Sequence, residues 1–130
     1  MNKLTLIIPL FILLILFVFC GGKNPASGKL LNTFKVDSIN VQLSGINIAA
    51  HYISVKIDEH ESQILIQGLF KYYQDVGGNK VSVDYNINDW YNKEMVHLGN
   101  EVQIIGSSIY VKIVNTQRNM ILKFYGKLAP

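Results

Sequence analysis

Downstream of residue 29, apolar and polar residues alternate in a series of short runs. The runs with an apolar residue at every second position cover residues 39–43, 53–58, 81–87, 109–113 and 120–125. Alternation over five to seven residues is typical of strands with one buried face. Turn-forming residues separate the runs, at 58–61, 75–79, 106–108 and 115–117. The pattern predicts an all-β fold of about seven to eight short strands, either an antiparallel β-sandwich, which we favour, or a small barrel.

Three further segments complete this prediction. Residues 29–37 (KLLNTFKVD) are expected to form a first edge strand. Residues 62–74 fit a strand or a helix, and we favour the strand because of the isoleucines, the tyrosines and the central Gly68. Residues 89–98 favour one short connecting helix, with Asp89 as a cap and Gly99 as the stop.

The N-terminal segment has a different pattern, because residues 4–20 form one uniformly apolar run. Lys3 is the only charge before this run, and the next charged residue is Lys23. A basic start followed by an apolar stretch and small residues is typical of a secretory signal. The run also reaches the lower end of the roughly 17–25 residues that cross a bilayer as a helix. We therefore predict export, with residues 1–20 as a hydrophobic signal or membrane-anchor helix.

The end of the run resembles the signal segment of bacterial lipoprotein precursors, in which a lipobox ends in a cysteine. The corresponding residues are Leu16-Phe17-Val18-Phe19-Cys20, and Cys20 is the only cysteine of the chain. The lipobox has a small residue directly before the cysteine, where this chain has the atypical Phe19. The resemblance covers the signal segment alone. It implies that Cys20 is diacylated and becomes the new N-terminus.

Other fates of this segment remain open. An ordinary signal peptidase could cut after the small residues at 20–22 or 26–28. An uncleaved segment would be a single-span anchor with Lys3 inside, and a buried core helix is a further alternative. Residues 21–28 (GGKNPASG) have the composition of a flexible linker. The predicted organisation is a signal or anchor at 1–20, a linker at 21–28 and one β-sandwich domain at 29–130.

Composition excludes several classes of protein. Without Lys3, 11 basic and 9 acidic residues remain, and they are scattered along the chain. Nucleic-acid binding requires a basic patch, so we predict no nucleic-acid partner. A single cysteine cannot form a disulfide within the chain, so the exported domain depends on its packing alone.

Catalytic and metal-binding patterns are absent from the sequence. The three histidines, His51, His60 and His97, do not have the spacing of a zinc site or of a catalytic pair. His60 lies among acidic residues at 58–61, which we interpret as a solvated turn. No Gly-x-Ser-x-Gly motif or phosphate-binding loop occurs. We predict a non-enzymatic protein without a metal or cofactor.

Two pairs of neighbouring aromatic residues are the candidates for a ligand site. In a strand, one member of Tyr72-Tyr73 and one of Trp90-Tyr91 must point away from the core. An exposed ring beside amides and a carboxylate suits a carbohydrate or protein ligand. The alternative, which we favour, is that Trp90 plugs the end of the core and the tyrosines are ordinary strand residues.

The function expected from these observations is a non-catalytic binding module of the cell envelope, outside the cytoplasm. Its attachment to the membrane would be through the N-terminal segment or a lipid on Cys20. The alternative is a structural or assembly subunit of an envelope complex that pairs through a sheet edge.

Overall fold

The computed structural model describes residues 28–94 and 99–130. The predicted signal segment with Cys20, the linker up to residue 27, and the stretch 95–98 with His97 lie outside the described residues. Within the described part, no helix is long and apolar enough to span a membrane. The elements are seven strands: β1 (Leu30–Leu43), β2 (Ile46–His60), β3 (Gln63–Val76), β4 (Asn79–Asn92), β5 (Glu101–Ile105), β6 (Ser108–Asn115) and β7 (Met120–Leu128).

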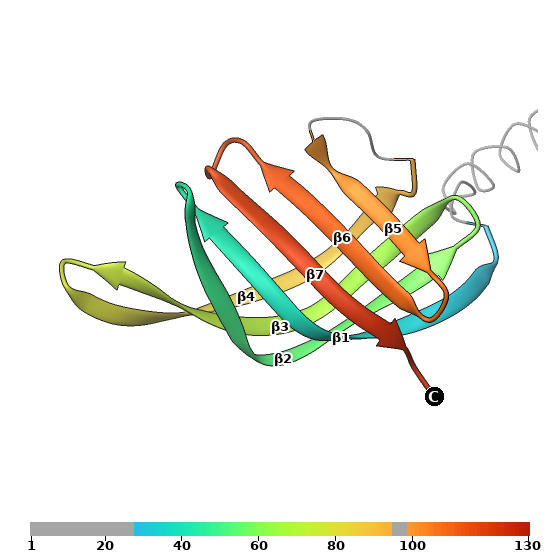
Figure 1. Ribbon diagram of the computed structural model, residues 1–130, viewed down its shortest axis with the longest axis horizontal. Coiled ribbons are helices and arrows are strands. Elements are labelled where there is room, and N and C mark those ends of the chain that lie inside the picture. The colour runs from blue at the N-terminus through green and yellow to red at the C-terminus, as the bar shows by residue number, and fades with distance from the viewer. Residues whose placement is uncertain (1–27, 95–98) are drawn as a thin grey trace, which may run out of the picture.

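All seven strands belong to one open antiparallel sheet (Figure 1). Its order is β4-β3-β2-β1-β7-β6-β5, with β1 in the centre and β4 and β5 at the two edges. Short hairpin turns connect β1 through β4 and β5 through β7, and residues 93–100 carry the chain from one edge to the other. The two sets of hairpins, β1–β4 and β5–β7, are joined into one sheet by the pairing of β7 with β1.

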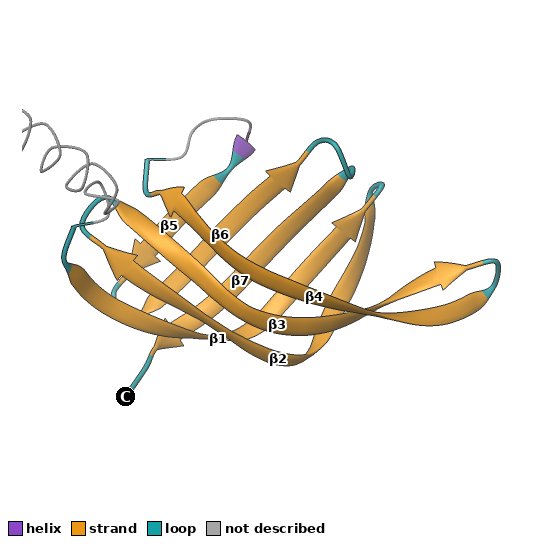
Figure 2. Cartoon of the chain, turned by 180° about the vertical axis from the view of Figure 1, so that it is seen from behind, coloured by secondary structure: helices purple, strands orange, loops and turns teal. Residues whose placement is uncertain are grey.

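The sheet folds over, so that β3 and β4 lie across β5, β6 and β7 in two layers (Figures 1 and 2). The rings of Phe70 on β3 and Phe124 on β7 meet edge to face, with centroids 6.2 Å apart. In a flat sheet, three strand spacings of about 4.8 Å would separate β3 from β7 by roughly 14 Å. The contact across this distance shows that the two halves enclose a common core.

Local backbone features produce the fold in the sheet. The β2–β3 register shifts between His51 and Ser54, where Tyr52 adopts a φ of 49°. Opposite this bulge, Gly68 has a φ of 144°, and a Cβ there would lie 2.0 Å from the carbonyl oxygen of Ser54. Bulges bend a strand and increase its twist. Only glycine permits the two backbones to approach this closely.

The core consists of inward-facing residues from both layers. Aromatic and β-branched side chains at alternate strand positions are buried, as expected for the enclosed face of a folded sheet. The largest fully buried side chains are Phe34, Phe70, Phe124, Ile57, Ile64, Ile66, Val41 and Val111.

The predicted all-β, antiparallel architecture is confirmed, and so is the choice of a strand for residues 63–73. The turns expected near Gly77-Gly78 and Gly106-Ser107 also occur. The predicted sandwich differs from the structure in one respect, because a single continuous sheet supplies both layers.

Two predictions about individual elements are wrong. Residues 29–37 do not form an edge strand, because residues 30–37 belong to the central strand β1. The short helix expected from Asp89 is absent over its described part, where residues 89–92 complete β4. These residues pair with β3 in an unbroken register that ends at Gln63↔Asn92. Strand pairing over long range has overridden the local helical spacing.

Candidate functional site

A groove opens where the β1–β2 hairpin and the β3–β4 hairpin diverge. Pairing between β2 and β3 ends at Ala50↔Tyr72. Each hairpin continues beyond this point with its own partner, to Leu43↔Ile46 in one and to Val76↔Asn79 in the other. Figure 1 shows the β3–β4 hairpin projecting away from the rest of the sheet. We call the space between the two hairpins the hairpin groove.

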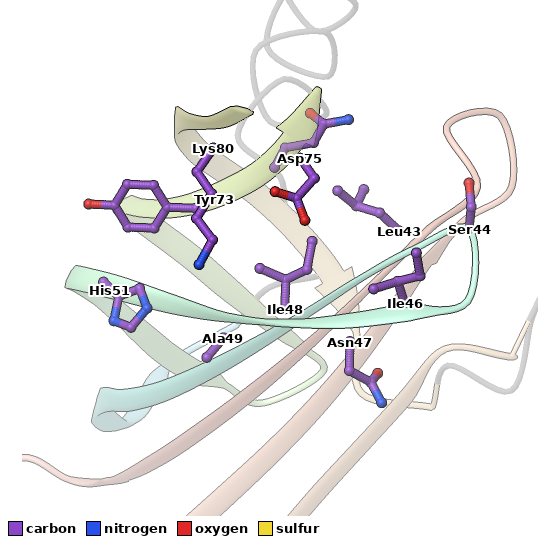
Figure 3. Close-up of a pocket in the computed structure, with 11 residues that line it drawn as sticks. Leu43, Ser44, Ile46, Asn47, Ile48, Ala49, His51, Tyr73, Asp75 and Lys80 are labelled. Atoms are coloured by element: carbon purple, nitrogen blue, oxygen red, sulfur yellow. The ribbon is translucent and has the colours of Figure 1, made fainter. Parts of the chain in front are cut away.

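The hairpin groove has an apolar wall and a mixed wall. Its volume is about 540 Å³, within the range of sites that hold small molecules or peptide segments. Leu43, Ile46 and Ile48 line the side formed by the β1–β2 hairpin (Figure 3). Tyr73, Asp75 and Lys80 line the opposite side.

The two walls also present backbone groups without a strand partner. Residues 46–49 of β2 pair with β1 on one side only, and residues 73–76 of β3 pair with β4 on one side only. The other edges of both segments face the groove. Along a strand, backbone N–H and C=O groups point alternately to the two edges, so each segment offers about two donors and two acceptors here. A strand entering the groove would satisfy them.

Exposed apolar side chains lie on both hairpins that form the groove. Ile46 is 67% exposed, and Val76 and Val81 at the tip of the projecting hairpin are 55% and 45% exposed. Clustered apolar exposure rimmed by polar groups is characteristic of interaction sites. His51 lies against Tyr73, with ring centroids 5.8 Å apart, and extends the aromatic part of the surface toward Ala50.

The structure separates the four aromatic residues that the sequence suggested as one ligand site. Trp90 lies on the outer face of β4, is 38% exposed and contacts His60 edge to face at 4.9 Å. Tyr72 is buried in the core. Tyr73 lines the hairpin groove. Trp90 pairs with Leu65, eight residues from Tyr73 along β3, a separation of roughly 25 Å at strand spacing. Tyr73 and Trp90 therefore do not share one platform.

Tyr91 lies on the core side of β4 and is half-buried. Its hydroxyl group donates a hydrogen bond to Asp89 over 3.4 Å. Burial, and then the negative charge of Asp89, raise the pKa of Tyr91 far above its ordinary value. The phenol therefore stays protonated, and the side chain packs against the core.

The histidines that are described do not converge. His51 and His60 are nine residues apart along β2, one beside the hairpin groove and the other beside Trp90. Within residues 28–94 and 99–130, no group of three His, Cys, Asp or Glu side chains is placed to hold a metal ion.

Glu59 is the one buried charged residue of the described chain, and its carboxylate is bonded to neighbouring side chains. It is 8% exposed. It accepts a hydrogen bond from Asn32 at 2.9 Å and forms an ion pair with Lys93 at 2.7 Å. Burial alone would raise the pKa of Glu59, but the hydrogen bonds from Asn32 and Lys93 and the charge of Lys93 outweigh it and lower that pKa. The ion pair closes one end of the core.

Sequence reasoning missed Ile46 and Ile48 as site residues. The available signal was Ser44-Gly45 between two alternating runs, which is a two-residue hairpin turn. Comparisons of this chain with protein-family models, with curated proteins and with solved structures found no match.

Proposed function

We propose that this protein is a non-catalytic binding module of the cell envelope, whose hairpin groove captures an extended segment of a partner protein. The observation that carries the proposal is the pair of free strand edges, 46–49 and 73–76, that face each other across the groove. Adding a strand to an exposed sheet edge is a common mode of peptide recognition, with affinity from backbone hydrogen bonds and specificity from alternate side chains.

The chemistry of the groove defines the segment it would bind. Ile46 and Ile48 lie two residues apart on β2, so a paired strand would place every second side chain against them. The partner segment should therefore carry apolar residues at alternate positions. Asp75 and Lys80 are opposite each other on the other wall, so polar side chains of either charge find a partner there.

The proposed location rests on the N-terminal sequence. The apolar run at 4–20 and its resemblance to a lipoprotein signal support export and attachment to the membrane through Cys20. The intact mass of the protein from the membrane fraction, for wild type and Cys20→Ala, tests this. Loss of a diacyl mass shift in the variant is the expected result. An unchanged full-length mass in both would instead indicate an uncleaved anchor.

Selection of peptides from a displayed random library, on the full chain in detergent, tests the groove. Peptides with alternating apolar residues should be enriched, and hydrogen exchange should slow at the amides of residues 46–49 when such a peptide binds. Ile46→Asp should weaken binding at least tenfold, because it introduces a charge into the apolar wall. Ile105→Asp on β5 is the matched control, since Ile105 is 74% exposed and lies outside the groove.

Two results would contradict a role of the groove. One is equal peptide affinity of Ile46→Asp and Ile105→Asp, because both variants place a carboxylate on an exposed strand residue and only Ile46 lines the groove. The other is a bound peptide that slows amide hydrogen exchange elsewhere in the chain but not at residues 46–49 or 73–76.

A second function, assembly through a sheet edge, is favoured by the geometry of β4. This strand pairs with β3 over all 14 residues without a register shift, and within the described chain its other edge has no partner strand. A long edge without a bulge or proline is suited to pairing with another chain. Sedimentation velocity of the wild type and of Ser82→Lys/Asn86→Lys would detect such assembly. The substitutions should abolish concentration-dependent association, and a wild type that stays monomeric would exclude self-assembly.

A further inference from the structure

The layer formed by β5, β6 and β7 carries a pair of tyrosines on its outer face. Tyr110 on β6 lies directly opposite Tyr125 on β7, with ring centroids 5.1 Å apart and ring planes inclined by 39°. The same row of the sheet continues to Gln103 on β5 and to Ser38 on β1. Tyr125 is 41% exposed. The rings therefore form a ledge on an open sheet face, with an amide on one side and a hydroxyl on the other.

A shallow hollow of about 230 Å³ adjoins this ledge. Its lining includes both tyrosines and the polar side chains of Asp37, Gln103 and Lys127. Asp37 is the extra residue of a bulge, because the β1–β7 register shifts between Val36 and Ser38. Bulges redirect side chains beside binding sites. An aromatic floor with hydrogen-bonding groups at its rim is thus assembled from four strands.

Lysines flank the tyrosine pair on both sides. Lys112 lies opposite Lys123 one row away, and Lys127 lies opposite Lys35 in the row on the other side. Lys35 in turn lies opposite Lys56 on β2. Like charges directly opposite each other destabilise a sheet. Five lysines in such positions make this face basic, and an anion bound there would relieve their repulsion.

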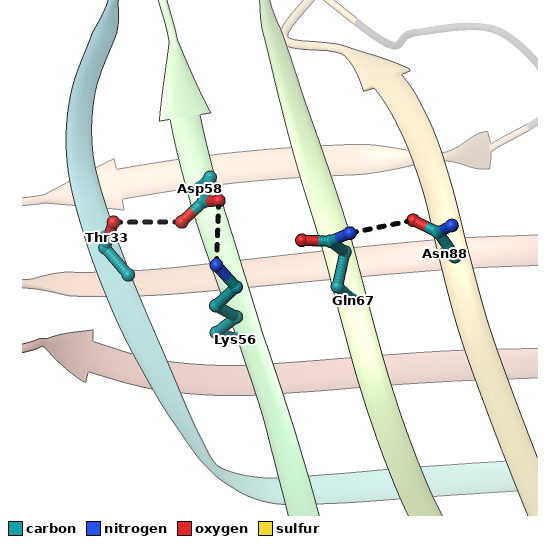
Figure 4. A network of polar contacts seen from close by, with 5 residues as sticks. All are labelled: Thr33, Lys56, Asp58, Gln67 and Asn88. Carbon is teal, nitrogen blue, oxygen red and sulfur yellow. Dashed lines mark hydrogen bonds and ion pairs between the residues drawn. The ribbon is translucent and has the colours of Figure 1, made fainter.

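Within the described chain, only one of these lysines forms an ion pair. Lys56 forms an ion pair with Asp58 at 3.3 Å, and Asp58 also accepts a hydrogen bond from Thr33 (Figure 4). The other ion pairs within residues 28–94 and 99–130 involve Lys71 and Lys93. Lys35, Lys123 and Lys127 lie opposite no carboxylate in the sheet, so their charge is available to an anionic ligand, whereas Lys112 lies opposite Glu101.

We propose that this tyrosine–lysine face binds an acidic polysaccharide. The rings of Tyr110 and Tyr125 stack against the apolar faces of sugar rings. Gln103 and the carboxylate of Asp37 bond with hydroxyl groups, and the lysines on both sides pair with acidic groups along the glycan. The site is separate from the hairpin groove and does not depend on strand capture.

The acidic side chains of the face distinguish a polysaccharide from a nucleic acid. Asp37 lines the hollow, and Glu101 lies opposite Lys112 in the adjacent row. A carboxylate accepts hydrogen bonds from hydroxyl groups but repels a backbone with one phosphate per residue. A ligand rich in hydroxyl groups, with its charges spaced apart, fits this mixture better than a polynucleotide.

Binding of the full chain in detergent to fluorescently labelled glycans tests the proposal. The acidic probes are alginate, heparin and a phosphorylated mannan, the neutral probe is dextran of similar length, and oligothymidylate represents nucleic acid. We expect at least one acidic glycan to bind, at least tenfold more tightly than dextran, with an affinity that falls as salt is raised. Tyr125→Ala should lower this affinity at least fivefold, whereas Tyr125→Phe, which keeps the ring, should retain most of it.

Tyr52→Ala is the matched control, because Tyr52 is 79% exposed beside a lysine but lies outside the face. It should bind the glycan like the wild type. Circular dichroism of each variant establishes that the fold is intact. Tighter binding to oligothymidylate than to every acidic glycan would overturn the proposal in favour of a nucleic-acid ligand. Failure of all three acidic glycans to bind, or equal affinities of folded Tyr125→Ala and Tyr52→Ala, would also overturn it.

Discussion

Substitution of Gly68 by alanine tests the bend that brings the two layers together. Gly68 has a φ of 144°, where a side chain is strained. An alanine Cβ would lie 2.0 Å from the carbonyl oxygen of Ser54 and 2.7 Å from the Cα of Val55. Both neighbours are backbone atoms of β2, which cannot rotate away as a side chain can. Alanine therefore forces β2 and β3 apart at the bulge.

The structure gives an approximate magnitude for this change. The unfavourable φ costs about 1–3 kcal/mol, and displacing well-packed neighbours costs about 1–3 kcal/mol. We therefore expect Gly68→Ala to lower the free energy of unfolding by about 3 kcal/mol, which in a domain of this size lowers Tm by about 12–24 °C.

Thermal unfolding followed by far-ultraviolet circular dichroism measures the effect. Gly45→Ala is the matched control, because Gly45 also has a positive φ, 87°, but an alanine Cβ there would have no atom within 4 Å. The control should lose only about 1 kcal/mol, the cost of the backbone conformation alone. Equal decreases in Tm for the two variants would refute the steric argument and the close approach of β2 and β3 on which it depends.

Two further predictions concern the core and its charged end. Phe70→Ala removes a ring that stacks on Tyr85 at 5.0 Å and contacts Phe124, so urea unfolding should show a loss of about 3–5 kcal/mol. A loss below about 1 kcal/mol would contradict packing between the layers. Because the folded-state pKa of Glu59 is lowered from its ordinary value, its ionised form stabilises the fold above the unfolded-state pKa, and this contribution is lost as the pH falls through the folded-state pKa. Wild type should therefore exceed Glu59→Gln in Tm at pH 6–7, and the difference should shrink below about pH 4. If the difference in Tm between wild type and Glu59→Gln did not change with pH, the loss of stability would come from the altered side-chain packing and not from the lost charge.

The fold class could be predicted from the sequence because strand alternation is a local property. Residues 81–87 and 109–113 alternate without interruption, and each lies within one strand of the sheet. The length of β1 could not be predicted in the same way. Val36 and Ile39 both face the core although they are three residues apart, because the bulge at Asp37 inserts one residue. The alternation of buried and exposed positions shifts by one residue at this bulge. The single strand β1 therefore has the sequence pattern of two separate short strands.

The candidate sites depend on pairings that no local pattern contains. The hairpin groove exists because β2–β3 pairing stops at Ala50↔Tyr72 while both hairpins continue. The lysine rows combine β7, β1 and β2, and β7 lies far from the other two along the chain. The Tyr110–Tyr125 pair could not be predicted from the sequence either, although both residues lie in predicted strands. Its register depends on the observed turn, because Asn115↔Met120 closes the hairpin at 116–119. The turn expected at 115–117 would instead have placed Tyr110 opposite Leu122.

The spacing of the two proposed sites along β1 determines whether they can act independently. Ser38, opposite Tyr125, and Leu43, at the groove, are five residues apart, or about 17 Å. Substitutions separated by more than about 10 Å without shared contacts have additive effects. Ile46→Asp should therefore leave glycan affinity unchanged, and Tyr125→Ala should leave peptide affinity unchanged. A folded variant that bound both the peptide and the glycan more weakly would contradict this independence. The two surfaces would then belong to one extended binding site along β1, and strand capture and glycan binding would not be separate functions.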